Sequence, residues 1–109
     1  LASPYSHPDP LIMKTRFLLA EQVTAALLTS RRHVYSPIVH CHELSLKYHL
    51  PTEFIFWRDY NFDMLRRCDD FLILKIPGWD QSKGVAAELE LANLLRINRG
   101  FINENGEFI

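Results

Sequence analysis

One carboxylate in this chain falls where a core residue is expected. In the predicted helix from Ser82 to Ile97, Glu88 lies on a stripe of small and apolar residues, because positions three and four apart share a helix face. Glu90 falls on a more mixed face. A carboxylate that faces a core needs hydrogen bonds or suffers a large desolvation penalty, so such residues are frequent in functional sites. Glu88 is therefore the leading candidate for a reactive group; the alternative is a solvated acid that complements the helix dipole.

Three turns are expected to surround Glu88. In an open parallel α/β sheet, the ligand crevice lies beyond the carboxyl ends of the strands. The turn Ser3–Tyr5 follows the first predicted strand, and Ser36–Pro37 lies at the end of the second. Pro77–Trp79, together with the turn at Ser82, follows the third. The topology thus predicts that these turns meet at one edge of the sheet, close to the start of the helix that carries Glu88.

Strands and helices alternate along the chain, which predicts an α/β fold. The predicted strands cover residues 1–3, 34–39, 71–76 and 100–102, and the predicted helices cover residues 11–28, 42–49, 51–67 and 82–97. The run 71–76 is almost entirely apolar, as in a strand covered on both faces. Strands separated by helices imply right-handed crossovers and a parallel sheet. We therefore expect a three-layer α/β/α sandwich around a small Rossmann-like sheet of four to five strands, with part of the first strand preceding Leu1.

Length and composition indicate one domain without a strongly charged partner. The 109 residues suffice for a single core, so residues 1–109 are expected to form one domain. The net charge of -1, from 12 basic and 13 acidic residues, argues against a nucleic acid duplex or an anionic membrane as partner. Two cysteines, no apolar run long enough for a bilayer and no signal peptide predict a cytoplasmic protein.

The tripeptide His40-Cys41-His42 contains side chains that bind metals. No third or fourth ligand stands at a suitable spacing, whereas metal sites need several ligands in one geometry. We therefore expect no metal ion and no cofactor, and we assign these residues to helix capping or to the rim of a pocket.

The run from Ser82 to Ala92 also carries a family signature. Its pattern Ser-x-Gly-Val-x-x-Glu-Leu-x-x-Ala resembles the signature of the nucleoside 2-deoxyribosyltransferase-like superfamily, which includes the 2'-deoxynucleoside 5'-phosphate N-hydrolases. The segment Ala2–Tyr5 is similar to the family's turn after the first strand, and Leu65–Asp69 is similar to a segment with a site aspartate. The whole pattern most resembles a branch of bacterial and phage proteins within this superfamily.

This resemblance implies cleavage of the N-glycosidic bond of a nucleoside or nucleotide. Glu88 would be the nucleophile and would form a glycosyl-enzyme intermediate after an oxocarbenium-like transition state. Asp69 would donate a proton or a hydrogen bond to the leaving base, with its neighbour Asp70 as the alternative match. If water accepts the sugar from Glu88, the protein is a hydrolase. If a second base accepts it, the protein is a deoxyribosyltransferase.

Further substrate contacts follow from the same resemblance. A serine at Ser82 is typical of members that act on nucleoside 5'-monophosphates, because a hydroxyl beside a helix N-terminus can donate to a phosphate. The alternative is that Ser82 serves only as the N-cap of the helix, a role that involves no ligand. Tyr5 lies where the family places a residue near the sugar, and Trp79 or Trp57 either stacks on a base or packs in the core. The predicted substrate-binding residues are Ser3, Tyr5, Ser82, Gly84 and Trp79.

Two positions depart from the family pattern. Ser3 replaces the glycine of the first turn, and Glu90 stands where characterised members usually have glycine; either side chain can narrow the pocket or change its substrate. The alternative functions are a non-catalytic nucleotide-binding module of the same fold and an interaction protein. Because related enzymes complete their sites across subunits, the resemblance also implies a homo-oligomer with shared sites, to which Asn103 and Asn105 are candidates to contribute.

Overall fold

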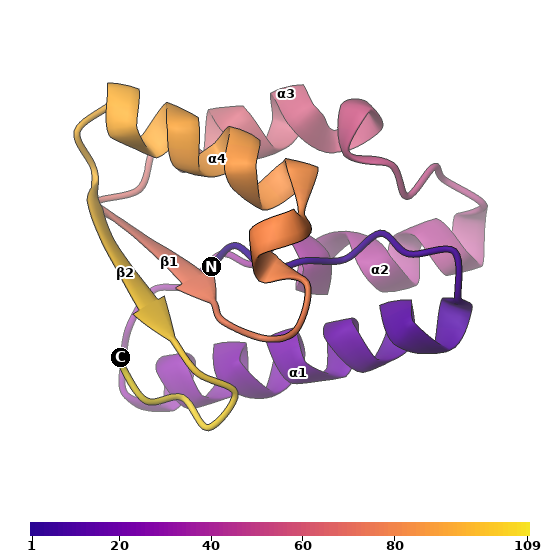
Figure 1. The fold of residues 1–109 in the computed structure, drawn as a ribbon, viewed down its shortest axis with the longest axis horizontal. Coiled ribbons are helices and arrows are strands. Elements are labelled where there is room, and N and C mark those ends of the chain that lie inside the picture. Colours follow the sequence, from indigo (N-terminus) through magenta and orange to yellow (C-terminus); the bar gives the residue numbers. More distant parts are fainter.

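Two short strands separate two pairs of helices. The computed structural model describes all of residues 1–109. The elements in chain order are α1 Pro10–Thr29, α2 Pro37–Tyr48, α3 Phe54–Leu65, β1 Asp70–Leu74, the 3-10 turn η1 Trp79–Gln81, α4 Lys83–Leu94 and β2 Asn98–Ile102. Figure 1 shows α1 and α2 on one side of the strands and α3 and α4 on the other. None of these helices is both long and apolar enough to cross a membrane.

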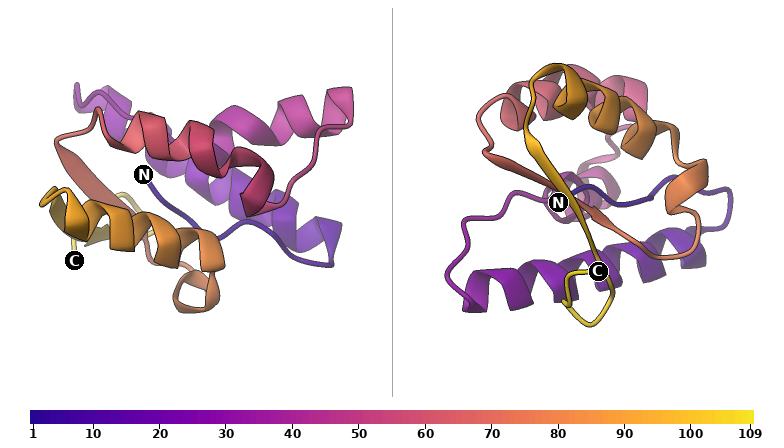
Figure 2. Two further views of the ribbon diagram at one scale, coloured as in Figure 1. Left: turned by 90° about the horizontal axis from the view of Figure 1, so that it is seen from above. Right: turned by 60° about the vertical axis from the view of Figure 1, so that its left-hand side comes forward.

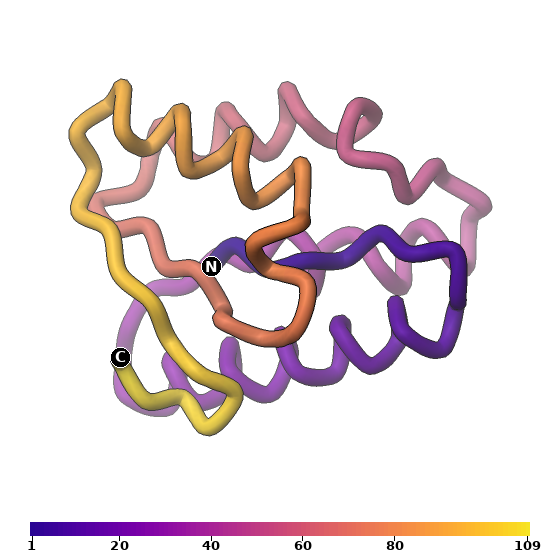
Figure 3. Tube along the Cα trace, in the orientation of Figure 1, coloured from indigo at the N-terminus to yellow at the C-terminus, as the bar shows by residue number.

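The sheet is smaller than the sequence pattern predicts. Strand β1 pairs with β2 in parallel, from Asp70 opposite Asn98 to Leu74 opposite Ile102. The N-terminal segment runs beside β1 (Figure 3), but only Ala2 forms a bridge to it, opposite Ile73. The regular sheet therefore has two strands, and the expected Rossmann-like sheet of four to five strands is wrong.

Two prolines explain the missing strands. Pro4 has no N–H, so the chain leaves the sheet directly after the bridge at Ala2. The segment 34–39, predicted as a strand, divides at Ser36, whose hydroxyl oxygen accepts a hydrogen bond from the Val39 amide at 3.2 Å. Pro37 therefore occupies the first position of α2, where its missing N–H and fixed φ are tolerated. Pro37, which the sequence analysis interprets as the end of a strand, is thus the first residue of a helix.

The two faces of β1 pack against different helices. Phe71 and Ile73 belong to one apolar cluster with Val85 and Ala92 of α4. Leu74, with Ile76 and Ile102, belongs to a second cluster with three residues of α1, namely Ala20, Val23 and Leu27. The right-hand view of Figure 2 shows the strands between α1 and α4. This arrangement explains the almost continuous apolar run of β1, because a strand that is covered on both faces has no side for polar residues.

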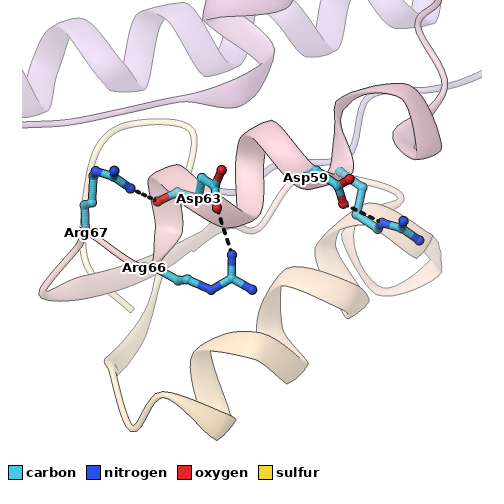
Figure 4. A network of polar contacts seen from close by, with 5 residues as sticks. Asp59, Asp63, Arg66 and Arg67 are labelled. Atoms are coloured by element: carbon cyan, nitrogen blue, oxygen red, sulfur yellow. Dashed lines mark hydrogen bonds and ion pairs between the residues drawn. The ribbon is translucent and has the colours of Figure 1, made fainter.

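The solvent-facing surface of α3 carries ion pairs beside exposed apolar and aromatic side chains. Arg66 pairs with Asp63 at 3.0 Å, and Arg58 pairs with Asp59 at 3.2 Å, all with largely exposed side chains (Figure 4). Arg67 donates to the Asp63 carbonyl oxygen in the same network. Exposed ion pairs of this kind contribute about 0–1 kcal/mol each. The opposite face of α3 therefore determines how this helix packs, and there Asn61 and Leu65 are buried.

We expect Leu74→Ala to lower the free energy of unfolding by about 2–5 kcal/mol, because it leaves a cavity beneath α1 at a fully buried position. Urea unfolding followed by circular dichroism measures the change. The control is Leu94→Ala on α4, where the side chain is 75% exposed and a change within about 0.5 kcal/mol is expected. Equal losses at both positions would contradict the central place of β1.

Candidate functional site

A cavity of about 400 Å³ lies where the N-terminal halves of α2, α3 and α4 face the loops beyond the strands. Ser3 and Tyr5 line it from the first turn, Pro37 from the second, and Gly78 and Ser82 from the loop after β1. The three turns therefore meet as the sequence predicts. The strand ladder is short, but the parallel direction of its segments still brings their carboxyl ends to one edge.

Glu88 forms part of the cavity wall and is almost completely buried. Its exposed fraction is 8%. No protein group donates a hydrogen bond to its carboxylate, and burial raises the pKa of Glu88 to about 7. Glu90 is exposed and lies outside the cavity, so it does not narrow this pocket. Helix periodicity therefore separated the inward acid from the outward one correctly.

Asn61 is a buried polar residue of the cavity that the sequence analysis missed. Only 7% of it is exposed, and its Oδ1 accepts a long hydrogen bond of 3.3 Å from the Tyr35 hydroxyl. Its NH₂ group remains available to donate. Asn61 and Glu88 line both the main cavity and a small adjoining pocket, which shows that they are neighbours. The four-residue spacing between Asn61 and the core residue Leu65 is the signal that places it on the inward face of α3.

Tyr5 is held in the cavity wall from two sides. Its hydroxyl lies 2.6 Å from Nδ1 of His42, and the His42 ring stacks on Phe17 of α1 with 4.2 Å between ring centroids. The Arg16 guanidinium donates to the Tyr5 carbonyl oxygen at 3.3 Å. Burial raises the pKa of Tyr5 to about 12 and lowers the pKa of His42. The Tyr5 hydroxyl is therefore engaged by the His42 imidazole.

The start of α4 forms a polar part of the wall. The Ser82 Oγ accepts a hydrogen bond from the Val85 amide at 3.2 Å, which confirms that Ser82 is the N-cap. Its hydroxyl proton remains free to donate, and the first amides of a helix have no partner within it. Lys83 and Arg16 add positive charge to the lining. This part of the cavity suits an anion.

Two glycines shape the same region. Gly78 has a φ of +96°, and a Cβ there would run into the Arg16 guanidinium. Gly84 lies so close to α3 that a Cβ would come within 3.2 Å of the Phe54 ring. Gly84 lines the cavity as predicted, and its role visible here is to let α4 approach α3.

Apolar side chains of α2 and α3 form another part of the wall. They are Pro37, Ile38, Cys41, Phe54 and Trp57. The Trp57 indole N–H donates to the Pro51 carbonyl oxygen at 2.8 Å, which fixes the orientation of the ring. A flat apolar group has suitable contacts here.

Ser3 lines the cavity with a hydroxyl that has no partner. The residue is 6% exposed, and its Oγ makes no hydrogen bond. The serine that departs from the family pattern is therefore a cavity-lining residue whose hydroxyl is buried and unpaired.

Two predicted site residues lie elsewhere. Asp69 is exposed and lines a separate cavity with Arg31 and Arg67. It comes directly before β1, at the amino end of a strand about 16 Å long, whereas Glu88 is at the carboxyl end. Trp79 lies outside the Glu88 cavity, because its ring packs against Phe101 with 5.2 Å between centroids. The structure therefore does not bring Asp69 and Trp79 into the cavity that contains Glu88.

The side chains of His40-Cys41-His42 have separate surroundings. His40 stacks on Tyr60, with 5.3 Å between ring centroids, Cys41 lines the cavity, and His42 is bonded to Tyr5. No three histidine, cysteine, aspartate or glutamate side chains are grouped so that they could hold a metal ion.

Comparison with family models gives one match. Residues 1–101 match the model described as "Domain of unknown function (DUF1937)". The chain belongs to the DUF1937 family. No curated protein matches the chain. The description of DUF1937 states no activity, so the resemblance to the nucleoside 2-deoxyribosyltransferase-like superfamily is still a prediction, and so are the roles of Glu88 and Ser82.

The raised pKa of Glu88 predicts a pH-dependent stability. Between about pH 4.5 and 7 the unfolded carboxyl group loses its proton while the folded one keeps it, so this residue lowers the free energy of unfolding as the pH rises. We therefore expect Glu88→Gln to be more stable than the native protein at pH 8, by up to about 3 kcal/mol, and equally stable at pH 4. Urea unfolding at both pH values measures the difference. The control is Glu90→Gln, for which no such trend is expected; a parallel trend in both variants would refute the burial of Glu88.

The bond between Tyr5 and His42 predicts a second stability effect. We expect Tyr5→Phe to lower the free energy of unfolding by about 1–2 kcal/mol, because it leaves the buried Nδ1 of His42 unpaired. Thermal or urea unfolding measures this loss. Tyr48→Phe, at a position 60% exposed, removes a hydroxyl with little effect and serves as the control. A Tyr5→Phe protein as stable as the control would show that the bond is absent in solution.

Proposed function

We propose that this protein binds a nucleoside 5'-monophosphate and cleaves its N-glycosidic bond, with Glu88 as the nucleophile. The observation that carries this proposal is a buried carboxylate without hydrogen bonds in a cavity that also holds the start of α4. A carboxylate below the anomeric carbon stabilises positive charge that develops there. The resemblance in sequence around Ser82 and Glu88 supports the same reaction.

The reaction has two steps. In the first, a carboxylate oxygen of Glu88 bonds to the anomeric carbon as the carbon–nitrogen bond breaks, and the electron pair of that bond leaves with the base. In the second, water adds to the anomeric carbon, releases Glu88 and loses a proton. A second base in place of water gives deoxyribosyl transfer. Since only ionised Glu88 can attack, product release should rise with pH to about 7.

Asn61 takes the place beside the leaving base that the sequence analysis gave to Asp69. Its Oδ1 is occupied by Tyr35, so its NH₂ can donate a hydrogen bond to a ring nitrogen or oxygen of the base. An amide stabilises the departing base by hydrogen bonding and does not transfer a proton. The apolar wall that includes Ile38 and Trp57 supplies contacts for the base ring.

The start of α4 supplies contacts for the phosphate. The Ser82 hydroxyl and the first amides of α4 donate to phosphate oxygens, and Arg16 and Lys83 neutralise part of their charge. The proposal also includes a homo-oligomer with shared sites, as in the related enzymes, and a cytoplasmic location, since Cys41 and Cys68 are free thiols.

One observation favours the non-catalytic alternative, a nucleotide-binding module of the same fold. The acids that line the cavity are Glu53 and Glu88, and Glu53 is exposed. The site therefore has no buried acid besides the nucleophile to protonate a leaving base. A module of this kind binds nucleotides and releases no base.

Incubation with ribo- and deoxyribonucleoside 5'-monophosphates, followed by chromatography of the free base, tests the proposal. The native protein should release base from at least one of them, and Glu88→Gln should reduce the rate by at least about a hundredfold, because it removes the nucleophile. Glu90→Gln changes an exposed acid two positions along the same helix and should retain the native rate.

The outcomes separate the two functions. Binding of a nucleotide without release of base would replace the enzyme by the binding module. Release that is equal in the native protein and Glu88→Gln would exclude Glu88 as the nucleophile. A protein that neither binds nor cleaves any nucleotide would exclude both functions.

A further inference from the structure

Arg16 is a half-buried cation without an acidic partner. It belongs to α1 and lines the cavity that contains Glu88. The two ion pairs of the protein both involve α3 and its C-terminal end, so no carboxylate pairs with the Arg16 guanidinium. Partial removal of a charge from water is unfavourable unless another group compensates for it. A ligand anion in the cavity can supply that compensation.

Two backbone carbonyl groups hold the guanidinium in place and leave part of it free. Its Nη1 donates to the carbonyl oxygen of Tyr5 at 3.3 Å and to that of Ser6 at 3.1 Å, whereas Nε and Nη2 have no acceptor in the protein. The unpaired side-chain atoms without accessible surface are hydroxyl oxygens of two other residues, so these nitrogen atoms remain accessible. The guanidinium is therefore fixed by the first turn and still has donors for a ligand.

Gly78 makes room for this guanidinium. A Cβ at position 78 would run into Nη2 of Arg16, and the φ of +96° is a conformation that glycine adopts without strain. The loop after β1 therefore lets Arg16 reach the cavity from α1. A side chain at position 78 would displace the guanidinium.

The guanidinium lies on the same side of the cavity as the start of α4. The Gln81 amide donates to the Gly78 carbonyl oxygen at 3.2 Å, and this tight turn keeps Ser82 within about 8 Å of Gly78. A phosphate group between Arg16 and Ser82 has oxygen atoms for both. Lys83 also lines the cavity, but it is exposed, so water screens its charge more effectively.

We propose that Arg16, packed against Gly78, is the residue that makes this site select phosphorylated over unphosphorylated nucleosides. This inference rests on the proposed function, in which the substrate is a nucleoside 5'-monophosphate. A phosphate accepts charge-assisted hydrogen bonds from the free guanidinium nitrogen atoms. A nucleoside presents a neutral hydroxyl at the same end and leaves the half-buried charge without a counter-ion.

Nucleosides paired with their own 5'-monophosphates test the proposal. The selectivity ratio is the dissociation constant of the nucleoside divided by that of the nucleotide, measured by titration calorimetry. The native ratio should be at least about ten. Arg16→Gln keeps an N–H donor for the first turn but removes the charge, so it should lower the ratio about tenfold. Arg16→Lys keeps the charge without the planar fork and should retain part of the ratio.

Gly78→Ala tests the same site with Arg16 still present. The new Cβ displaces the guanidinium, so this variant should lower the ratio as Arg16→Gln does, and it carries the test if Arg16→Gln does not fold. Gly106→Ala is the matched control. Gly106 also has a positive φ, of +79°, but its Cβ would meet Ala26, and Gly106 does not line the cavity. It should keep the native ratio.

Inorganic phosphate is an independent probe of the anion site. Millimolar phosphate should raise the Tm of the native protein and leave that of Arg16→Gln unchanged, because a ligand stabilises only the protein that binds it. Potassium chloride at equal ionic strength is the control for screening.

The outcomes keep this inference apart from the proposed function. A native ratio close to one, or a ratio that Arg16→Gln or Gly78→Ala leaves unchanged, would overturn the role of Arg16, whether or not base is released. A ratio lost in both variants without release of base would support Arg16 and contradict the enzyme. If no nucleoside or nucleotide binds, the proposed function fails, and phosphate decides the rest. An equal Tm shift in the native protein and Arg16→Gln, or none, would then overturn the role of Arg16 as well.

Discussion

A carboxylate held inside the protein without hydrogen bonds is the constraint on which the site depends. Burial of Glu88 opposes folding, so other contacts must keep its helix in place. Val85 and Ala92, one turn before and after Glu88, pack against Phe71 and Ile73 of β1. The apolar residues of α4 thus provide the stability that holds the acid inward, and β1 in turn is held by α1 on its other face.

Much of the fold could be predicted because helix starts and a doubly covered strand have local signals. Asp9 caps α1 by accepting the Leu11 amide at 2.9 Å, Ser82 caps α4, and the apolar run of β1 is where the pattern places it. The sheet could not be predicted in the same way. Pro37 is compatible with the end of a strand and with the first position of a helix, and only the contact between Ser36 and Val39 decides between them.

In the candidate site too, the residues that could be predicted are those with a local sequence signal. Glu88 and Ser82 belong to one helix, so their spacing alone places them correctly. Asn61 and Arg16 reach the cavity from α3 and α1, and their approach depends on how those helices pack. Asp69 is the converse case. A position next to a strand does not state which end of the strand it occupies, and the direction of β1 puts Asp69 at the end away from Glu88.

An unpaired buried polar atom does not by itself mark a functional site. Thr24 has one and lies in α1 away from the cavity, so a single such atom is compatible with a purely structural position. The cavity differs because two buried polar residues from distant parts of the chain, Ser3 and Glu88, both line it. By contrast, the charged residues on the outside of α3 satisfy one another (Figure 4). Several buried polar residues that meet at one cavity, rather than a single unpaired atom, are what supports the proposal of a polar ligand.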